Sequence, residues 1–285
     1  MVITSLFVEG NLMPKISVIM SVYNGEQFLR EAIDSILNQT FNDFEFIITD
    51  DYSQDNTFAI LEEYSKSDSR IIIVKNEQNQ GLTKSLNHMI DLAQGEFIAR
   101  MDADDISSLS RLEKQVEVLD GPLNIDFIFS NTVLIDDVSD VICNSWRPKS
   151  TREIIRLLSL VNYIPHPTVM VKSDIFKANK YSPNFVTGQD KELWLRLVNK
   201  KIQFYYIDEV LLKYRINFNS VRNKHSNKYI KYVTTCFSNN AKEKATKYFK
   251  YLKFFNKVIF IIKYLTPFKI VFYKGLLFRK IFNID

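Results

Sequence analysis

The stretch Ile16-Ser-Val-Ile-Met-Ser-Val-Tyr23 is a near-continuous apolar run, and Asn24-Gly25 ends it. A run with so little polar alternation is typical of a strand that is covered on both faces of a sheet. Helical spacing follows from Glu26 to Leu37, with an apolar stripe that begins at Phe28. The stretch therefore predicts a strand–turn–helix unit of the kind that builds parallel sheets.

Strand and helix patterns continue to alternate outward from this unit. The predicted strands are 44–49, 71–74, 97–101 and 127–135, and the predicted helices are 57–65, 82–92 and 111–119. Regular alternation predicts a parallel sheet with right-handed crossovers, whose ligands bind beyond the carboxyl ends of the strands. Tyr23, Asp51 and Asp102 come at such ends, and we expect them to converge on one crevice.

The pattern is less regular after Ser110. We expect helices at 152–160 and 192–199, a turn into a strand over 165–171, and two short strands at 204–207 and 210–215.

Three carboxylates follow the predicted strand Phe97–Met101, namely Asp102, Asp104 and Asp105. Side chains alternate along an extended chain, so an Asp-x-Asp pair presents both carboxylates on one side. Two hard oxygen donors suit Mg²⁺ or Mn²⁺, and a cation would offset the repulsion between the acids. The residues alone leave two alternatives open: solvated loop acids, or Asp105 as the cap of a helix beginning near Ser110.

Composition limits the classes of protein that the chain can represent. Its 285 residues suit one large domain, or one domain with an appendage. The two cysteines, Cys143 and Cys236, offer no disulfide framework or metal spacing, which favours a reducing cytosol. The chain contains no dinucleotide fingerprint and no Walker-type phosphate loop, and its first 13 residues do not resemble a signal peptide.

Charge divides the chain into two unlike parts. Residues 224–285 carry 14 Lys and Arg against two acids, whereas residues 1–223 carry 23 basic and 31 acidic side chains. Within the tail, Lys250, Lys253 and Lys257 fall on one side at helical spacing, with aromatic and aliphatic groups opposite. This pattern predicts helices that lie on an anionic membrane. The alternative is a helical pair packed on the protein or in a dimer. No nucleic-acid module is present.

An ordered series of motifs resembles the family-two glycosyltransferases, inverting enzymes with the GT-A nucleotide-diphospho-sugar transferase fold. The matching segments are 14–25, 35–41, 50–57, 79–81 with Asn87, 95–105, 166–168 and 189–196. The resemblance covers roughly residues 14–221 and leaves the tail outside.

The resemblance implies a role for each matching residue. Tyr23 and Asp51, with Ser21 close by, would contact the nucleotide base. Asp104 would ligate a metal that bridges the diphosphate, with Asp102 beside the metal or the ribose. Asp190 would deprotonate the acceptor hydroxyl.

Further residues have both a functional and a structural interpretation. His166 could face the sugar or the metal, although a lone histidine is often structural. Arg100 could bind phosphate or pair with the neighbouring acids. Trp194 could flank the acceptor or lie in the core. Asp190 could also cap the helix that follows it.

The chain departs from the family at four positions. Tyr52 stands where a glycine is usual, Gln189 where Glu is common, Leu109 in place of a proline and Asn217 in place of a histidine. Because every catalytic carboxylate is present, the resemblance still implies an active enzyme.

The resulting prediction is an α/β protein with a mostly parallel Rossmann-like sheet of the GT-A type and a C-terminal helical extension. Residues 1–223 would form the transferase domain, with a nucleotide-binding half at 14–120 and an acceptor half at 121–223, and residues 224–285 the tail.

The predicted function is inverting transfer from a nucleotide-diphosphate sugar, with a lean toward UDP, to a saccharide or lipid-linked saccharide in cell-surface polysaccharide synthesis. Mn²⁺ or Mg²⁺ would be the cofactor. The expected location is the cytoplasm, on the inner face of the cell membrane. The alternatives are an inactive nucleotide- or glycan-binding module and a nucleotidyltransferase on a similar sheet.

Overall fold

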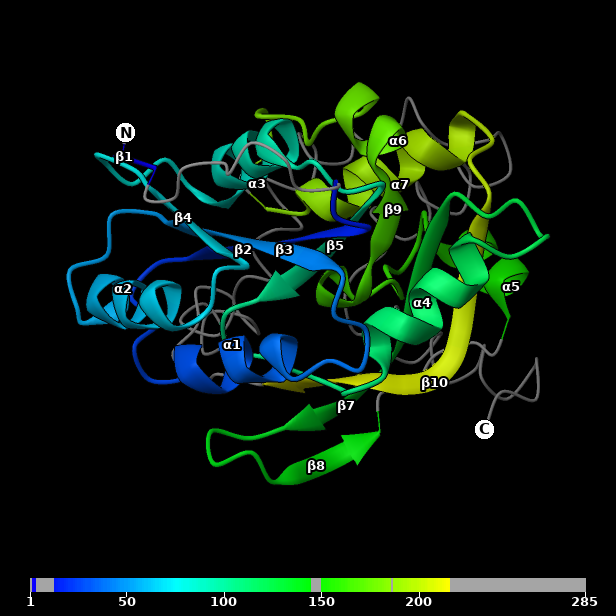
Figure 1. Ribbon diagram of the computed structural model, residues 1–285. Coiled ribbons are helices and arrows are strands. Elements are labelled where there is room, and N and C mark those ends of the chain that lie inside the picture. Colours follow the sequence, from blue (N-terminus) through cyan, green and yellow to red (C-terminus); the bar gives the residue numbers. More distant parts are fainter. Residues whose placement is uncertain (1, 4–12, 145–149, 186, 216–285) are drawn as a thin grey trace, which may run out of the picture. The chain divides into compact units, whose positions relative to one another are not determined.

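The computed structural model describes residues 2–3, 13–144, 150–185 and 187–215, arranged as Figure 1 shows. Most of these residues belong to one compact unit, which comprises residues 1–155 and 163–216. Residues 156–162 belong to a second unit. The remainder of the second unit lies outside the described residues, and so do Asn217 and the tail 224–285.

Parallel strands joined by helices form the first half of the sheet. The strands are β2 (Ile16–Val22), β3 (Phe44–Asp50), β4 (Ile71–Lys75) and β5 (Phe97–Asp102), in the spatial order β4-β3-β2-β5. The connecting helices are α1 (Leu29–Leu37), α2 (Thr57–Ser67) and α3 (Leu82–Leu92), and a short β1 (Val2–Ile3) pairs with β4. The predicted strand–helix alternation is therefore confirmed.

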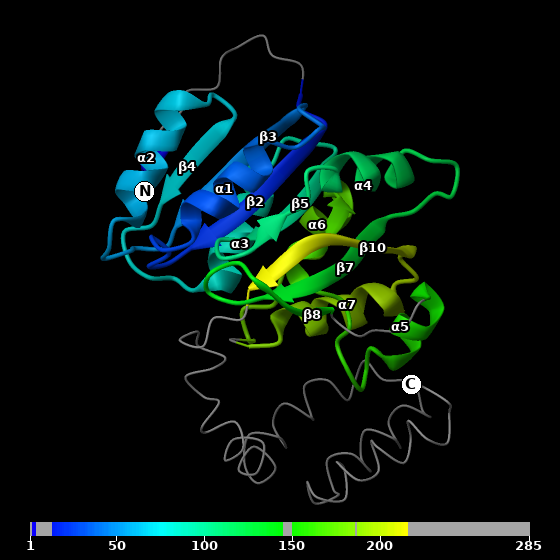
Figure 2. The same ribbon diagram turned by 90° about the horizontal axis from the view of Figure 1, so that it is seen from below.

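Helices cover both faces of this sheet, as Figures 1 and 2 show. Helices α1, α2 and α4 (Arg111–Leu119) lie on one face, over alternate strand residues such as Val18, Met20 and Ala99. Helices α3, α6 (Ser173–Ala178) and α7 (Gln189–Asn199) lie on the other. Because both faces are covered, every residue of β3 and all of β2 except Ser21 are buried.

The second half of the sheet mixes strand directions. The antiparallel β9 (Met170–Lys172) lies between β5 and β7 (Phe127–Ile135), and β10 (Phe204–Arg215) pairs in parallel with β7. The edges carry β6 (Ile106–Ser107) on β10 and β8 (Val141–Asn144) on β7. Helix α5 (Thr151–Leu157) and the 3₁₀ turn η1 (His166–Thr168) complete the elements.

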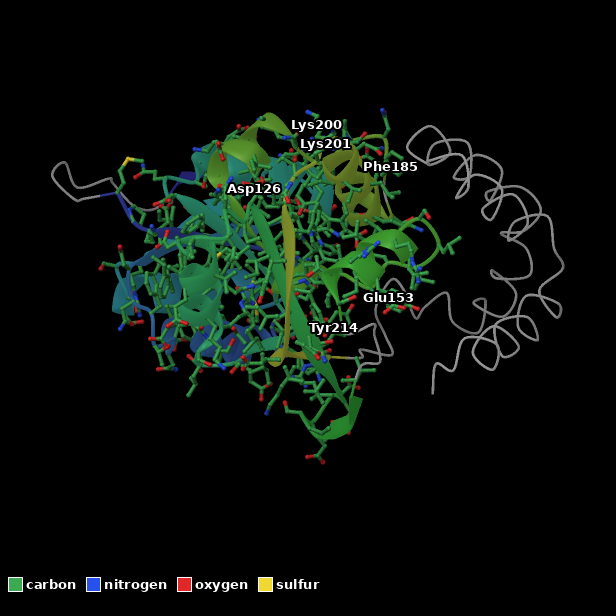
Figure 3. The ribbon with its side chains drawn as sticks, turned by 90° about the vertical axis from the view of Figure 1, so that its right-hand side faces the viewer. Asp126, Glu153, Phe185, Lys200, Lys201 and Tyr214 are labelled. Carbon is green, nitrogen blue, oxygen red and sulfur yellow. The ribbon has the colours of Figure 1, made fainter. Side chains whose placement is uncertain are left out.

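Strand β10 replaces the two short strands predicted at 204–207 and 210–215. Its pairing with β7 shifts register between Ile207 and Val210, and again before Leu212. The exposed Asp208-Glu209 pair breaks the apolar pattern there, which makes one bulged strand look like two. Figure 3 shows β10 passing from the end near Asp126 to Tyr214.

No helix among the described residues is long and apolar enough to cross a membrane.

Gly95 allows the loop before β5 to lie against the start of β2. A Cβ at this position would lie 2.4 Å from the backbone nitrogen of Ser17 and 2.6 Å from the carbonyl carbon of Ile16. The Gly95 amide donates to Ser17 Oγ over 2.8 Å, and Ser17 Oγ donates to the buried Glu45 carboxylate over 2.5 Å. This close approach starts β5 in register with β2.

We predict that Gly95→Ala destabilises the protein by about 1–3 kcal/mol or more, because the added methyl group meets backbone atoms that cannot rotate away. Urea unfolding followed by circular dichroism would measure the change. Gly81→Ala is the matched control, since a Cβ there meets no atom within 4 Å and only the φ of 82° resists it. Equal losses in both variants would contradict the steric explanation.

Candidate active site

The carboxyl ends of the parallel strands bring several of the predicted site residues together. Ser21 on β2 lies opposite Asp102 on β5, and Val22 lies opposite Asp50 on β3. The Asp51 amide donates to the Val22 carbonyl over 2.8 Å, so that the residues after β2 and β3 stay adjacent. The predicted convergence at one edge of the sheet is therefore observed.

The acids after β5 form a compact cluster. Oxygen atoms from the carboxylates of Asp102, Asp104 and Asp105 all lie within 4.8 Å of one another. Asp105 is buried, and Asp102 and Asp104 are half-buried. Oxygen donors from several carboxylates in this arrangement fit a divalent cation such as Mg²⁺ or Mn²⁺.

Electrostatics supports the same interpretation. Burial, and then repulsion from Asp102, raise the pKa of the Asp104 carboxyl to about 6. Burial raises the pKa of Asp105 well above its usual range, and Asp102 and Asp104 add to the shift. One buried oxygen of Asp105 has no hydrogen-bond partner among the described residues. A divalent cation would relieve this crowding.

Arg100 is the nearest cation to the cluster. Its buried side chain donates from Nη2 to Asp102, so the predicted pairing with a neighbouring acid is confirmed. Its Nε and Nη1 atoms are buried without a hydrogen-bond partner in the described part of the chain. Both nitrogens are closed to solvent in this structure, so the predicted phosphate contact of Arg100 stays a prediction.

Asp105 supports the end of β10 and does not cap a helix. Its Oδ1 accepts a 2.8 Å hydrogen bond from the Arg215 amide, whereas α4 begins at Arg111 after Ser110. The Arg215 guanidinium donates to the Asp104 carbonyl over 2.8 Å and to Glu31 over 2.5 Å. The capping alternative for Asp105 is therefore wrong.

A second buried arginine holds the turn that carries His166. Arg111 donates to the carbonyl of Pro167 over 2.9 Å and to that of Arg100 over 3.1 Å. Burial, together with repulsion from Arg100, lowers the pKa of Arg111 to about 9. Sequence reasoning assigned Arg111 only to a helix, because a contact with a carbonyl 56 residues away leaves no sequence pattern.

Asp51 anchors the loop before α3. Its Oδ1 accepts hydrogen bonds from Asn76 Nδ2 over 2.7 Å and the Gln80 amide over 2.8 Å, and its Oδ2 accepts one from the Gly81 amide over 2.8 Å. Both carboxylate oxygens therefore already have partners within the protein. The predicted contact with a base stays a prediction for Asp51.

His166 meets a tyrosine that the sequence reasoning missed. Its Nε2 lies 2.7 Å from the Tyr181 hydroxyl, and the Tyr181 backbone is held at both ends by the Asn87 amide, over 2.8 and 2.9 Å. Burial and the charge of Arg100 lower the pKa of His166 well below its usual value, so the imidazole is neutral at pH 7. Trp194 packs against His166 and is fully buried, which confirms its interpretation as core.

Asp190 lies in the first turn of α7. The helix begins one residue earlier, at Gln189, and its N-cap is Gly188 with a φ of 73°. The predicted capping role of Asp190 is therefore wrong, because a glycine in the left-handed region takes that position.

The Tyr181 hydroxyl responds to charges from both sets of acids. Burial raises its pKa above the usual range, Arg100 opposes the shift, and Asp190 and Asp102 add to it. Asp190 and Asp102 thus both act on one buried hydroxyl. No sequence motif had marked Tyr181.

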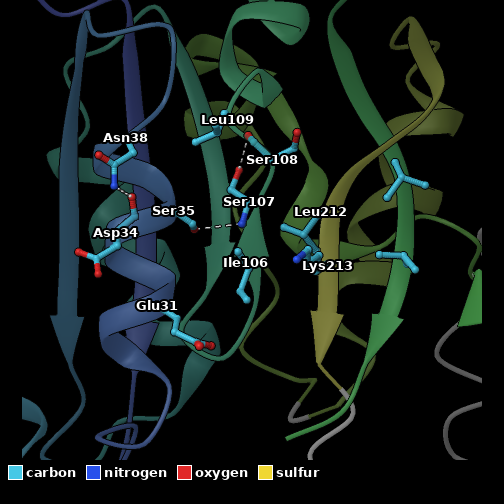
Figure 4. Close-up of a pocket in the computed structure, with 12 residues that line it drawn as sticks. Glu31, Asp34, Ser35, Asn38, Ile106, Ser107, Ser108, Leu109, Leu212 and Lys213 are labelled. Atoms are coloured by element: carbon cyan, nitrogen blue, oxygen red, sulfur yellow. Dashed lines mark hydrogen bonds between the residues drawn. The ribbon is translucent and has the colours of Figure 1, made fainter. Parts of the chain in front are cut away.

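A separate cavity of about 590 Å³ lies between α1 and the β6–β10 edge, as Figure 4 shows. Its walls include Glu31 and Asp34 from α1 and Ile106, Leu109 and Leu212 from the opposite side. None of the predicted site residues lines this cavity. The candidate active site is therefore the acid cluster at the strand ends.

Comparison with known proteins identifies a family. Residues 17–178 match the family described as Glycosyl transferase family 2. An uncharacterized glycosyltransferase, MJ1057 of Methanocaldococcus jannaschii, is 36% identical over 263 residues, which cover 89% of this chain and 90% of that protein. The Escherichia coli protein WfgD, named as a UDP-Glc:alpha-D-GlcNAc-diphosphoundecaprenol beta-1,3-glucosyltransferase, is 32% identical over 72% of this chain and 79% of its own length.

Solved structures share the fold. S. aureus TarS (residues 1–349, with UDP) superposes with a TM-score of 0.59 at 19% identity, over 87% of this chain and 78% of that chain. The mannosyltransferase PcManGT of Pyrobaculum calidifontis, with GDP-Man and Mn²⁺, superposes with a TM-score of 0.58 at 16% identity. The match covers 81% of this chain and 65% of that chain. The predicted GT-A type of sheet is confirmed.

We predict that Asp104→Asn raises the melting temperature of the metal-free protein, since it removes a carboxylate that burial and Asp102 both disfavour. A stabilisation of about 1–3 kcal/mol corresponds to a pKa shift of this size. The same change should abolish the stabilisation by Mn²⁺. Thermal unfolding with and without Mn²⁺ measures both effects, with Asp137→Asn at an exposed acid as the control.

The pH dependence has a definite sign. Because the folded-state pKa of Asp104 is raised to about 6, this group opposes folding above pH 6 and opposes it less as the pH falls toward 4. Mn²⁺ requires the ionised carboxylate, so its affinity should weaken up to about tenfold per pH unit below 6. Titration of Mn²⁺ at pH 7.5, 6.5 and 5.5 tests this. A pH-independent affinity would contradict the role of Asp104.

Proposed function

Since the chain belongs to glycosyl transferase family 2, we propose that it is a metal-dependent, inverting transferase that uses a nucleotide-diphosphate sugar, and specifically a UDP-sugar, as donor. The observation that carries the proposal is the cluster of Asp102, Asp104 and Asp105 at the carboxyl edge of the sheet, beside Ser21. The UDP-Glc in the name of WfgD and the UDP in the TarS structure support the choice of uridine.

The donor binds along the strand ends in this proposal. Tyr23 and Ser21 contact the nucleoside. Asp104 and Asp102 would hold the cofactor cation, which is Mn²⁺ or Mg²⁺. The Mn²⁺ in PcManGT supports this cofactor. Such an ion, when bound, neutralises charge that develops on the departing diphosphate. The buried Arg100, paired with Asp102, adds positive charge beside the same phosphates.

Asp190 acts as the general base. Its carboxylate takes the proton of the acceptor hydroxyl while the acceptor oxygen bonds to the anomeric carbon and the bond from that carbon to the diphosphate breaks. Attack from the side opposite the leaving group inverts the anomeric configuration. The neutral His166 lies within hydrogen-bond distance of the Tyr181 hydroxyl, whose pKa Asp190 helps to raise, and neither group is a carboxylate that would compete with Asp190 as base.

The acceptor is a saccharide or a lipid-linked saccharide in the synthesis of a cell-surface polysaccharide. Support comes from the relatives, among them an O-antigen biosynthesis glycosyltransferase of Escherichia coli and the diphosphoundecaprenol-linked acceptor in the name of WfgD. In this proposal the protein works in the cytoplasm, and the basic residues 224–285 hold it on the anionic inner face of the membrane.

We predict that Asp190→Asn lowers kcat by about 10²–10⁴-fold, the usual worth of a general base, while the donor Kd stays within about twofold. Transfer from a labelled UDP-sugar, with nuclear magnetic resonance of the product, gives the rate and the anomeric configuration. Asp174→Asn is the control, an acid in the first turn of α6 that has no assigned role. Near wild-type turnover of Asp190→Asn, or a retained configuration, would overturn the mechanism.

The membrane proposal is tested on the full chain. Replacement of Lys250, Lys253 and Lys257 by Gln should reduce flotation with phosphatidylglycerol vesicles, since each cation contributes about 1 kcal/mol near an anionic surface. Neutral phosphatidylcholine vesicles are the control. If flotation changes neither with the substitutions nor with the charge of the lipid, the proposed role of the tail is wrong.

A further inference from the structure

Tyr52 has an unusual backbone for a large side chain. It follows β3 and Asp51 with a φ of 69°, in the left-handed region that side chains with a Cβ resist. Glycine takes two other positions with positive φ, Gly81 and Gly188, and among the non-glycine residues with positive φ in the described part of the chain Tyr52 has the only aromatic side chain. Since glycine would adopt the conformation without strain, the tyrosine is not explained by the backbone it occupies.

The Tyr52 side chain also contributes little to the folded core. It is 46% exposed, and no ring contact or side-chain hydrogen bond is found for it within the described residues. The hydrogen bond that involves Tyr52 uses its backbone carbonyl, which accepts from Gln54 Nε2. Strained residues of this kind concentrate at functional sites, where a ligand gives the reason for them.

The loop of Tyr52 is fastened to the loop of Tyr23. The Asn24 amide donates to Ser53 Oγ over 3.0 Å, and the Gln54 amide donates to Asn24 Oδ1 over 2.8 Å. Asn24 itself has a φ of 50°, so both loops contain a left-handed residue at their point of contact. Tyr23 directly precedes Asn24 and Tyr52 directly precedes Ser53, so the two tyrosines stand on adjacent loops after β2 and β3.

Among the described residues, Tyr23 and Tyr52 are the two aromatic side chains with large exposed surfaces, at 51% and 46%. Two exposed tyrosines on adjacent loops, at the edge of the sheet that carries the acid cluster, suit a planar ligand, because a base can stack on an aromatic side chain through either of its faces. Asp51, which lies between them in the chain, already uses both of its oxygens on Asn76, Gln80 and Gly81. Stacking is thus the interaction that this edge offers most freely to a base.

We propose that Tyr52 is a second base-contacting residue, and that Tyr23 and Tyr52 together hold the base of the donor nucleotide by stacking. The inference rests on the proposed function, since it assumes a nucleotide donor at the strand ends. It adds a second aromatic side chain to the base contact expected of Tyr23. The ring, and not the hydroxyl, carries the effect.

The test compares Tyr52→Gly with Tyr52→Phe in the full chain, by calorimetric titration of UDP and of pyrophosphate in the presence of Mg²⁺. Tyr52→Gly should lower the affinity for UDP roughly 5–150-fold, which is the range expected for the loss of one base–aromatic stack. Pyrophosphate, which has no base, should bind within about twofold of the wild type. Tyr52→Phe should bind UDP like the wild type.

The controls separate the possible failures. Tyr52→Gly should melt at or above the wild-type temperature, because glycine accepts the left-handed backbone. Unchanged UDP affinity in Tyr52→Gly, or an equal loss for UDP and pyrophosphate, would overturn the inference while leaving the proposed function standing. A wild-type protein that binds neither UDP nor GDP would instead overturn the proposed function.

Discussion

Repulsion between carboxylates at the end of β5 is the constraint to which the surrounding structure responds. Asp102, Asp104 and Asp105 crowd together in a partly buried position, where water alone cannot offset their charges. Arg100 forms an ion pair with Asp102. The Arg215 guanidinium donates to the backbone carbonyl of Asp104, and the Arg215 backbone amide donates to the Asp105 carboxylate. A fold arranged only for stability would not collect these acids. Their retention is understandable if a divalent cation completes the balance of charge.

The arginines also connect the acid cluster to distant parts of the chain. Arg215 joins the end of β10 to the loop after β5, and Arg111 joins α4 to the turn of His166. The acid cluster, the turn of His166 and the second half of the sheet are therefore joined by hydrogen bonds from side chains to the backbone, and not by the sheet alone. Each such bond satisfies a buried carbonyl that would otherwise cost about 1–3 kcal/mol.

The fold was largely predictable because its signals are local. The apolar runs at 16–23 and 97–101 mark strands buried on both faces, and parallel topology then assigns the acids after them to one edge. Contacts between distant segments were not predictable. Asn87 holds Tyr181 across 94 residues, and nothing in their spacing marks the pair. The start of α7 was misplaced because Gly188 caps it through its backbone conformation, which a sequence does not display.

The insertion of β9 between β5 and β7 has a consequence for synthesis on the ribosome. Strand β5 is finished at residue 102, but its neighbour β9 ends only at Lys172, about 70 residues later. At ordinary elongation rates the open edge of β5 waits on the order of ten seconds for its partner. A nascent chain in this state carries an unpaired edge next to an apolar sheet, which favours pairing with other chains. Slow elongation or a crowded polysome would therefore lower the yield of folded protein.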